Sequence, residues 1–211
     1  MVDHSTATGK LTVKTVVVGD GAVGKTSLIT AYGENRFPQD YIPTVSDTYG
    51  GPVEYNGKEM TLNIWDTAGQ EEYANVRPLS YNGANVFVIC FSLANKESLE
   101  NATSKWVQEL KRLGPAQTPI VLCGTKADLR DELQAEGRTE WTDDKGINYT
   151  AVSTAEGEAA KKEKRFFSYV ECSAKLFENC GEVFNEAVKA AMLKPAAPPL
   201  TEKKKGFCSI L

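Results

Sequence analysis

The chain has 211 residues, with 24 basic and 28 acidic side chains and a net charge of −4 at pH 7. This length suits one domain with about thirty residues left for tails, and the mild acidity argues against nucleic acid as a partner, because proteins that bind nucleic acid are usually basic. The single histidine, His4, lies in a polar N-terminal segment, which argues against catalytic triads, histidine-bound zinc and imidazole general bases.

Neither secretion nor a membrane-spanning helix is expected. No apolar run approaches the ~18 residues that a membrane helix needs, and no charged-then-apolar signal peptide opens the sequence. Of the five cysteines, Cys90, Cys123 and Cys172 lie inside apolar runs, and none of the five forms a CxxC pair. These three are interpreted as buried, reduced thiols of a cytosolic protein.

The N-terminal part predicts a disordered extension followed by a strand, a loop and a helix. Residues 1–10 are polar and show no periodicity. The β-branched run 13–18 predicts a buried strand that ends at a glycine-rich loop, and residues 25–32 have helical composition. Residues 33–49 are polar and contain two prolines, so they predict an irregular segment.

A hairpin comes next. Residues 53–55 and 60–65 flank Asn56-Gly57, the strongest short-range signal for a tight turn between antiparallel strands. Residues 66–81 contain Gly69 and a proline and are expected to be irregular again.

Strands and helices then alternate. The apolar runs 86–91 and 120–123 predict buried strands, and residues 97–113 between them predict a helix that stops at Gly114. Its apolar face is made of Leu99, Trp106, Val107 and Leu110. Residues 131–146 are charged and interrupted by glycines, which is typical of an insertion rather than of core.

The last elements are a helix at 155–164, a strand at 167–171 and a helix at 182–193. This alternation predicts an α/β fold with a mostly parallel sheet. We expect one domain over residues 11–193 and a flexible tail over residues 194–211.

The segment from Gly19 to Thr26 fits the pattern G-x-x-x-x-G-K-[ST] between a predicted strand and a predicted helix. Glycines let backbone N–H groups point at phosphate oxygens, and the N-terminus of the helix adds the positive end of its dipole. In such a loop Lys25 contacts the β- and γ-phosphates, and the Thr26 hydroxyl binds Mg²⁺.

The same residues also fit G-x-G-x-x-G, the fingerprint of a dinucleotide site, through Gly19, Gly21 and Gly24. That site also needs an acidic residue about 20 positions later at the end of a strand, where this sequence has an irregular segment instead. The lysine and threonine would have no role in it, so the phosphate loop is favoured.

Asp66-Thr67-Ala68-Gly69 follows the third predicted strand. An aspartate at this edge can hold Mg²⁺ through water, and the N–H of Gly69 can approach a γ-phosphate, with Gln70 next in the chain. The tetrapeptide alone is common, and its position beside a phosphate loop is what makes it informative.

Two further motifs follow later strands. In Thr125-Lys126-Ala127-Asp128, the Asp128 carboxylate can accept from guanine N1–H and the 2-amino group, a donor pair that adenine lacks. Lys126 would lie along the plane of the base. Ser173-Ala174-Lys175 can offer a backbone N–H to guanine O6. Each motif stands at the carboxyl end of a predicted strand, where open α/β sheets bind ligands.

Over about residues 11–193 the sequence resembles a small GTPase of the Ras superfamily, and within it the Rho/Rac subfamily. The segments that carry the resemblance are GDGAVGKTSLI, YIPTV, WDTAGQEEY, RPLSY, FSL, TKADLRD and ECSAK. The resemblance implies a six-stranded sheet, five strands parallel and one antiparallel, with helices on both faces. It also implies that residues 131–146 correspond to the extra helical insertion of the Rho group, although Gly137 and Trp141 leave open a broken helix or a solvated loop.

The resemblance implies a role for each matching position. The phosphates are held by Gly21, Ala22, Val23, Gly24, Lys25, Thr26 and Ser27. Thr44 corresponds to a threonine that binds Mg²⁺ only with GTP present, and Phe37 to an aromatic residue that packs on guanine. Tyr41 corresponds to an aromatic residue that covers the phosphates, and Pro43 is included among the GTP-binding residues.

Catalysis is expected from Gln70, which would orient the attacking water, together with Thr44 and Lys25. Such phosphoryl transfer depends on positioning and electrostatics and needs no histidine. No arginine stands in the phosphate loop to act in cis, so we expect slow hydrolysis and dependence on an activating protein.

Three positions depart from the subfamily. Ser46 stands where a phenylalanine is usual, which leaves open which effectors bind and how tightly this segment is held. Thr48 replaces an asparagine that a class of bacterial toxins ADP-ribosylates, so that modification is not expected. Ser27 replaces a redox-sensitive cysteine of some relatives.

The tail ends in Cys208-Ser-Ile-Leu, a C-a-a-X pattern whose terminal leucine predicts geranylgeranylation of Cys208. Three lysines at 203–205 would supply the second signal for an anionic membrane, at about 1 kcal/mol each. We expect residence at the cytoplasmic face of the plasma membrane, with a cytosolic pool covered by a GDI-type chaperone.

The sequence thus predicts a monomeric GTP/GDP switch that hydrolyses GTP with Mg²⁺. The resemblance implies exchange factors, GTPase-activating proteins and effectors such as formins or kinases as partners, in signalling to the actin cytoskeleton and cell shape. Two alternatives stay open, namely a nucleotide-locked binding module that does not cycle and an ATP-dependent phosphotransferase built on the same loop.

Overall fold

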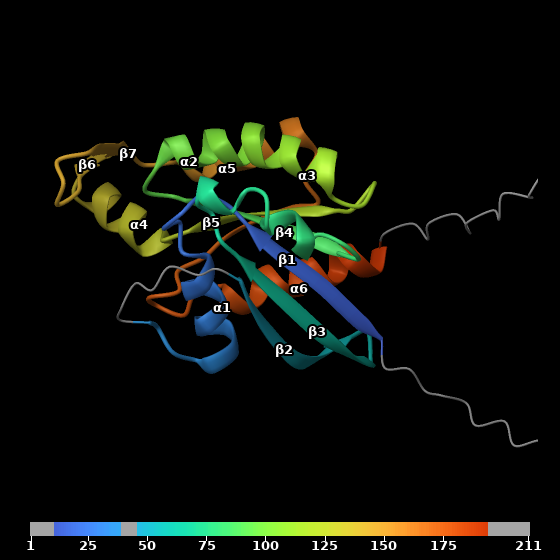
Figure 1. Cartoon of the computed structure of the whole chain (residues 1–211). Helices are drawn as coiled ribbons and strands as arrows, with labels where there is room; N and C mark the ends of the chain where they lie inside the picture. The colour runs from blue at the N-terminus through green and yellow to red at the C-terminus, as the bar shows by residue number, and fades with distance from the viewer. Residues whose placement is uncertain (1–10, 39–45, 194–211) are drawn as a thin grey trace, which may run out of the picture.

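The computed structural model describes residues 11–38 and 46–193, and these form a six-stranded sheet with helices on both faces (Figure 1). The strand order is β2-β3-β1-β4-β5-β8, in which only the β2–β3 pair is antiparallel. The strands are β1 (Thr12–Val18), β2 (Ser46–Tyr55), β3 (Lys58–Thr67), β4 (Val86–Ser92), β5 (Ile120–Thr125) and β8 (Ser168–Glu171). The predicted fold class is confirmed.

Helices cover the two faces of the sheet unequally. One face carries α1 (Lys25–Glu34) and α6 (Cys180–Leu193), while the other carries α2 (Lys96–Asn101), α3 (Val107–Leu113) and α5 (Thr154–Lys164) (Figure 1). Alternate residues of β1 point to opposite sides, so Val17 packs in the α1–α6 core and Val16 in the α3–α5 core.

The turn at Asn56-Gly57 joins β2 to β3, as the sequence predicts. Both residues have positive φ, 50° and 74°, which is the geometry of the two-residue turn that suits the twist of antiparallel strands.

The two segments predicted to be irregular contain more structure than expected. The helix α1 extends to Glu34. The strand β2 begins already at Ser46, because pairing with β3 organises residues that lack an alternating pattern of their own. Residues 66–81 include the end of β3 and two 3₁₀ turns, η1 (Glu71–Tyr73) and η2 (Arg77–Ser80).

The helix predicted at 97–113 is confirmed, with one irregular turn. α2 and α3 are joined by a π-helical turn, η3 (Ala102–Trp106), and the helix stops at Gly114. The four residues expected on its apolar face are all buried.

The insertion does not form the extra helix that the resemblance implies. α4 (Ala127–Ala135) ends within it, and a small hairpin of β6 (Glu140–Thr142) and β7 (Asn148–Thr150) follows. The Asp143 carboxylate accepts hydrogen bonds from the backbone N–H groups of Lys145 and Ile147, which closes the hairpin turn. Trp141 stacks on Tyr149 across the two strands, so local contacts favour a hairpin here.

The structure also tests the predictions of buried, reduced cysteines and of no membrane-spanning helix. Cys90, Cys123, Cys172 and Cys180 are free and buried, as predicted for the first three. Across residues 11–38 and 46–193, none of the helices combines the length and apolar character needed to cross a bilayer.

Candidate functional site

Four loops meet at the carboxyl edge of the sheet. They follow β1, β3, β5 and β8, which are parallel to one another, so their carboxyl ends lie on the same side. These are the four loops that carry the motifs found in the sequence.

The phosphate loop leads from β1 into α1 in a conformation that requires glycine. Gly24 has φ 100° at the start of the helix, and a Cβ on Gly19 would lie 2.2 Å from the carbonyl oxygen of Cys90. The buried Lys25 ammonium donates to the carbonyl oxygens of Gly19 and Asp20, at 2.8 and 2.7 Å. Burial lowers the pKa of Lys25, and its position inside the loop suits contact with phosphate oxygens.

Thr26 and Asp66 bring two oxygen ligands together. The Thr26 hydroxyl donates a 2.6 Å hydrogen bond to the Asp66 carboxylate, which is buried at the end of β3. Within the described ranges no group of three acidic, histidine or cysteine side chains could hold a metal ion. The Thr26–Asp66 pair of oxygens fits Mg²⁺, which takes one or two protein oxygens and completes its shell with phosphates and water.

Gly69 and Gln70 lie against the phosphate loop. A Cβ on Gly69 would come within 2.3–2.5 Å of backbone atoms of Gly19 and Asp20, so only glycine fits there. The Gln70 side chain lies 3.6 Å from the position of a Cβ on Gly21. The glutamine is thus beside the loop that would hold the phosphates.

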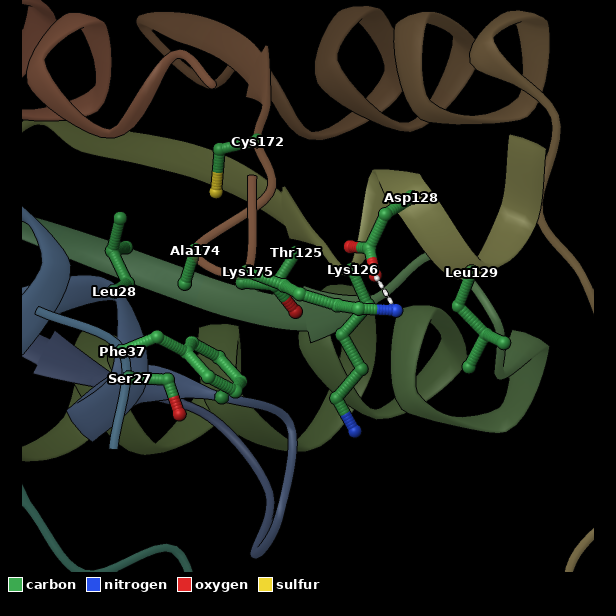
Figure 2. Close-up of a pocket in the computed structure, with 11 residues that line it drawn as sticks. Ser27, Leu28, Phe37, Thr125, Lys126, Asp128, Leu129, Cys172, Ala174 and Lys175 are labelled. Atoms are coloured by element: carbon green, nitrogen blue, oxygen red, sulfur yellow. Dashed lines mark ion pairs between the residues drawn. The ribbon is translucent and has the colours of Figure 1, made fainter. Parts of the chain in front are cut away.

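A cavity of about 210 Å³ opens next to the phosphate loop (Figure 2). Phe37 and Ser27 lie at one end of it, and Asp128 and Leu129 at the other (Figure 2). The full lining is Gly24, Ser27, Leu28, Phe37, Thr125, Lys126, Asp128, Leu129, Cys172, Ala174 and Lys175. Apolar walls with one carboxylate at the end suit a flat heteroaromatic ring with a pair of N–H donors.

Asp128 is held in place by the loop after β8. The Ser173 hydroxyl donates to one Asp128 oxygen at 2.7 Å, and the Lys175 ammonium lies 3.8 Å from the other. Ser173 is fully buried, and its backbone N–H donates to the carbonyl of Glu178. Ser173 therefore orients Asp128 instead of lining the cavity, whereas Ala174 and Lys175 do line it.

Thr125 and Lys126 connect this cavity to the phosphate loop. The Thr125 hydroxyl lies within hydrogen-bond distance of the carbonyl oxygens of Val23 and Phe91, and the Lys126 ammonium donates to the carbonyl of Ala22 at 2.8 Å. Burial lowers the pKa of Lys126. Its aliphatic part forms one wall of the cavity, as expected for a side chain that lies along a base.

Of the predicted site residues, the cavity is lined by Gly24, Ser27, Phe37, Thr125, Lys126, Asp128, Ala174 and Lys175, whereas Lys25, Thr26, Asp66, Gly69 and Gln70 lie in or beside the phosphate loop. Tyr41, Pro43 and Thr44, and the lipidation candidate Cys208, lie outside the described residues. Sequence reasoning missed the lining residues Leu28, Leu129 and Cys172, which read as ordinary core positions in the sequence.

Sequence reasoning also missed the support beneath the loop. The Asp20 carboxylate accepts hydrogen bonds from Asn101 and Trp106, at 2.9 and 2.8 Å. Asp20 is 81 and 86 residues distant from these partners, so no local pattern indicates the contacts.

One comparison with known proteins bears on this site. The family model described as the Ras family matches residues 14–193, a range that holds all four motif loops and most of the chain. Members of this family bind guanine nucleotides and are generally GTP hydrolases. The chain therefore belongs to the Ras family.

Proposed function

We propose that this chain is a Rho-like small GTPase that binds GTP and GDP with Mg²⁺, hydrolyses GTP slowly and recruits effectors in the GTP state. The observation that carries the proposal is the Asp128 carboxylate, fixed by Ser173 at the end of an apolar cavity that adjoins the phosphate loop. A guanine ring there presents N1–H and its 2-amino group to Asp128, with Phe37 and Lys126 beside the ring.

The phosphates extend from this cavity over the loop at the start of α1. Backbone N–H groups and the Lys25 ammonium bind their oxygens, and Gln70 orients a water for attack on the γ-phosphate. When Mg²⁺ is bound through Thr26 and Asp66, it neutralises charge that develops on the phosphate oxygens. Contacts with the γ-phosphate would select the conformation of the segments around residues 33–49 and 69–81 that binds effectors, and hydrolysis would release it.

The Asp128→Asn variant tests this reading of the cavity. An amide at this place can donate to the 2-oxo group of xanthine, so preference should move from GTP to xanthosine triphosphate. Binding of both nucleotides is measured by competition with a fluorescent analogue, with Asp144→Asn in the exposed hairpin turn as the matched control. Unchanged preference, or preference for ATP, would contradict a guanine site.

Single-turnover hydrolysis of loaded GTP distinguishes a switch from a nucleotide-locked binding module. A slow but measurable rate that falls in the Gln70→Leu variant supports the switch. GTP that is retained without hydrolysis in the wild-type chain would favour the locked module.

The Rho/Rac assignment rests on the sequence segments that resemble that subfamily, and the hairpin at β6–β7 departs from its helical insertion. We propose exchange factors, GTPase-activating proteins and effectors such as formins or kinases as partners, in actin and cell-shape signalling. A pulldown with the GTP-loaded Gln70→Leu form, compared with the GDP-loaded wild type, identifies which effectors bind.

We also propose membrane attachment through a geranylgeranyl group on Cys208, reinforced by the lysines at 203–205, with a GDI-type chaperone covering the lipid in the cytosol. The Cys208→Ser variant should lose partitioning to the plasma membrane, and a triple Lys→Gln variant should weaken it at physiological salt. Unchanged partitioning of the Cys208→Ser chain would refute the anchor without affecting the nucleotide site.

A further inference from the structure

Arg77 lies under the segment that carries Gln70, with no exposed side-chain area. One terminal nitrogen donates to the carbonyl of Ala68 at 2.7 Å and to that of Gln70 at 3.3 Å. Its other two nitrogens donate to the two oxygens of Glu109 on α3, both at 2.9 Å. A single guanidinium thus joins α3 to the carbonyls on both sides of Gly69.

The effect of this arrangement is to hold Gly69 between two partners. On one side Gly69 packs so closely on Gly19 and Asp20 that a Cβ would overlap with them. On the other side Arg77 fixes the two neighbouring carbonyls. The backbone that presents the Gly69 N–H and the Gln70 side chain is therefore restrained from both directions.

Trp106 connects this support to the phosphate loop. Its fully buried ring faces Arg77, with the guanidinium carbon 4.5 Å from the ring centroid. Its indole N–H donates to Asp20 at 2.8 Å. One side chain therefore contacts both the loop that would hold the phosphates and the arginine that holds the Gln70 segment.

Trp106 lies at the end of the π-helical turn η3, which orients its ring toward Arg77 and Asp20. The turn inserts one residue into the helix, and the hydroxyls of Thr103 and Ser104 donate back to carbonyls of the preceding turn. Glu109, one turn further along the helix, also accepts a hydrogen bond from the Tyr81 hydroxyl. Trp106 and Glu109, which both contact Arg77 beneath the Gln70 segment, thus belong to the same continuous helix.

We propose that Arg77 and Trp106 are positioning residues for GTP hydrolysis, which keep Gly69 and Gln70 in register with the phosphate loop through the continuous helix formed by η3 and α3. The inference rests on the proposed hydrolytic function. Neither residue lines the cavity, so their contribution should appear in the rate of hydrolysis and much less in the retention of nucleotide.

The test uses the full chain loaded with GTP and Mg²⁺. Trp106→Phe keeps an aromatic ring over Arg77 and removes the N–H that Asp20 accepts. Arg77→Lys keeps the charge and removes the planar fork that spans Ala68, Gln70 and Glu109. Trp141→Phe is the matched control, because its indole N–H donates to the Ala94 carbonyl and not to the Asp20 carboxylate.

Both variants are expected to slow single-turnover hydrolysis about 10-fold, less than the roughly 100-fold that a 1 Å misplacement of a catalytic group can cost. The release of fluorescent GDP should stay within about 2-fold of wild type, and Trp141→Phe should match wild type in both assays. If Asp20 and Trp106 act through one contact, Asp20→Ala combined with Trp106→Phe should be no slower than Asp20→Ala alone.

Hydrolysis within 2-fold of wild type in Trp106→Phe overturns the inference. So does a loss of hydrolysis accompanied by equally faster GDP release and a lower melting temperature, since that pattern reports a structural role alone. If Arg77→Lys does not fold, Trp106→Phe decides. A wild-type chain that binds GTP and never hydrolyses it would instead refute the proposed function.

Discussion

The ammonium of Lys126 donates a hydrogen bond to the carbonyl oxygen of Ala22, so the loop after β5 is tied directly to the loop after β1. Both residues have positive φ, 59° and 60°, a conformation that side chains other than glycine seldom adopt. Both strained backbone positions lie where the loop after β5 contacts the phosphate loop. The base site and the phosphate site are therefore one connected unit.

Lys126→Ala should accelerate GDP release by about 10-fold or more. A hydrogen bond from a charged donor contributes roughly 1.5–3 kcal/mol, and about 1.4 kcal/mol corresponds to a factor of ten. The variant also removes one wall of the cavity. Dissociation of fluorescent GDP in stopped flow measures the effect, and the exposed Lys162→Ala on α5 is the control. Equal release rates in the two variants would show that the Lys126 contact does not hold nucleotide.

Gly69→Ala should destabilise the folded chain, whereas Gly181→Ala should not. The new Cβ at 69 would lie 2.3–2.5 Å from backbone atoms that cannot move like a flexible side chain, and such overpacking costs about 1–3 kcal/mol. Gly181, in the first turn of α6, has open space around it, where alanine should stabilise the helix by up to about 1 kcal/mol. Urea unfolding in the presence of GDP compares the two. A Gly69→Ala chain as stable as wild type would contradict the close packing described above.

The parts of this molecule that sequence predicts well are those that depend on neighbours in the chain. Asn56-Gly57 specifies its own turn, and the pattern from Gly19 to Thr26 needs only a strand before it and a helix after it. The Arg77–Glu109 pair spans 32 residues and depends on how η2 packs on α3, so no local signal reveals it.

The sequence leaves open whether the insertion at 131–146 is a helix or a loop, and it does not predict the hairpin at β6–β7, for a related reason. The resemblance assigns a helix to an insertion of this charge, but the contacts that decide the outcome are between side chains in this chain. Trp141 donates to the Ala94 carbonyl and stacks on Tyr149, and both contacts require an extended backbone pairing. Composition alone carries none of this information.

Removal of Mg²⁺ should accelerate nucleotide release from the wild-type chain by at least about 10-fold, because phosphate charge is then no longer neutralised beside Thr26 and Asp66. Thr26→Ala should release GDP faster in Mg²⁺ and respond less to EDTA, since one ligand is already missing. Release of fluorescent GDP is followed with and without EDTA, with Thr142→Ala in β6 as the control. The same EDTA response in Thr26→Ala and wild type would exclude the threonine as a ligand.

The folded chain should lose stability in acid through the carboxylate of Glu156. The hydrogen bond from Lys96 and those from Ser153 lower the pKa of Glu156 to about 2, from an ordinary value of 4.5. A folded-state pKa below the unfolded one means that the stabilisation is complete above about pH 4.5 and disappears as the pH falls toward 2.

Because the Glu156 side chain is 37% exposed, solvent screening reduces its contribution to about 1 kcal/mol. Glu156→Gln keeps an acceptor for the Ser153 N–H and removes only the charge. It should therefore be less stable than wild type at pH 6.5 and approach wild type at pH 3.5, when both chains are unfolded by urea with GDP present. Glu163→Gln, an exposed change on the same helix, is the control. A difference between Glu156→Gln and wild type that is the same at both pH values would show that the carboxylate charge is not what stabilises this end of α5.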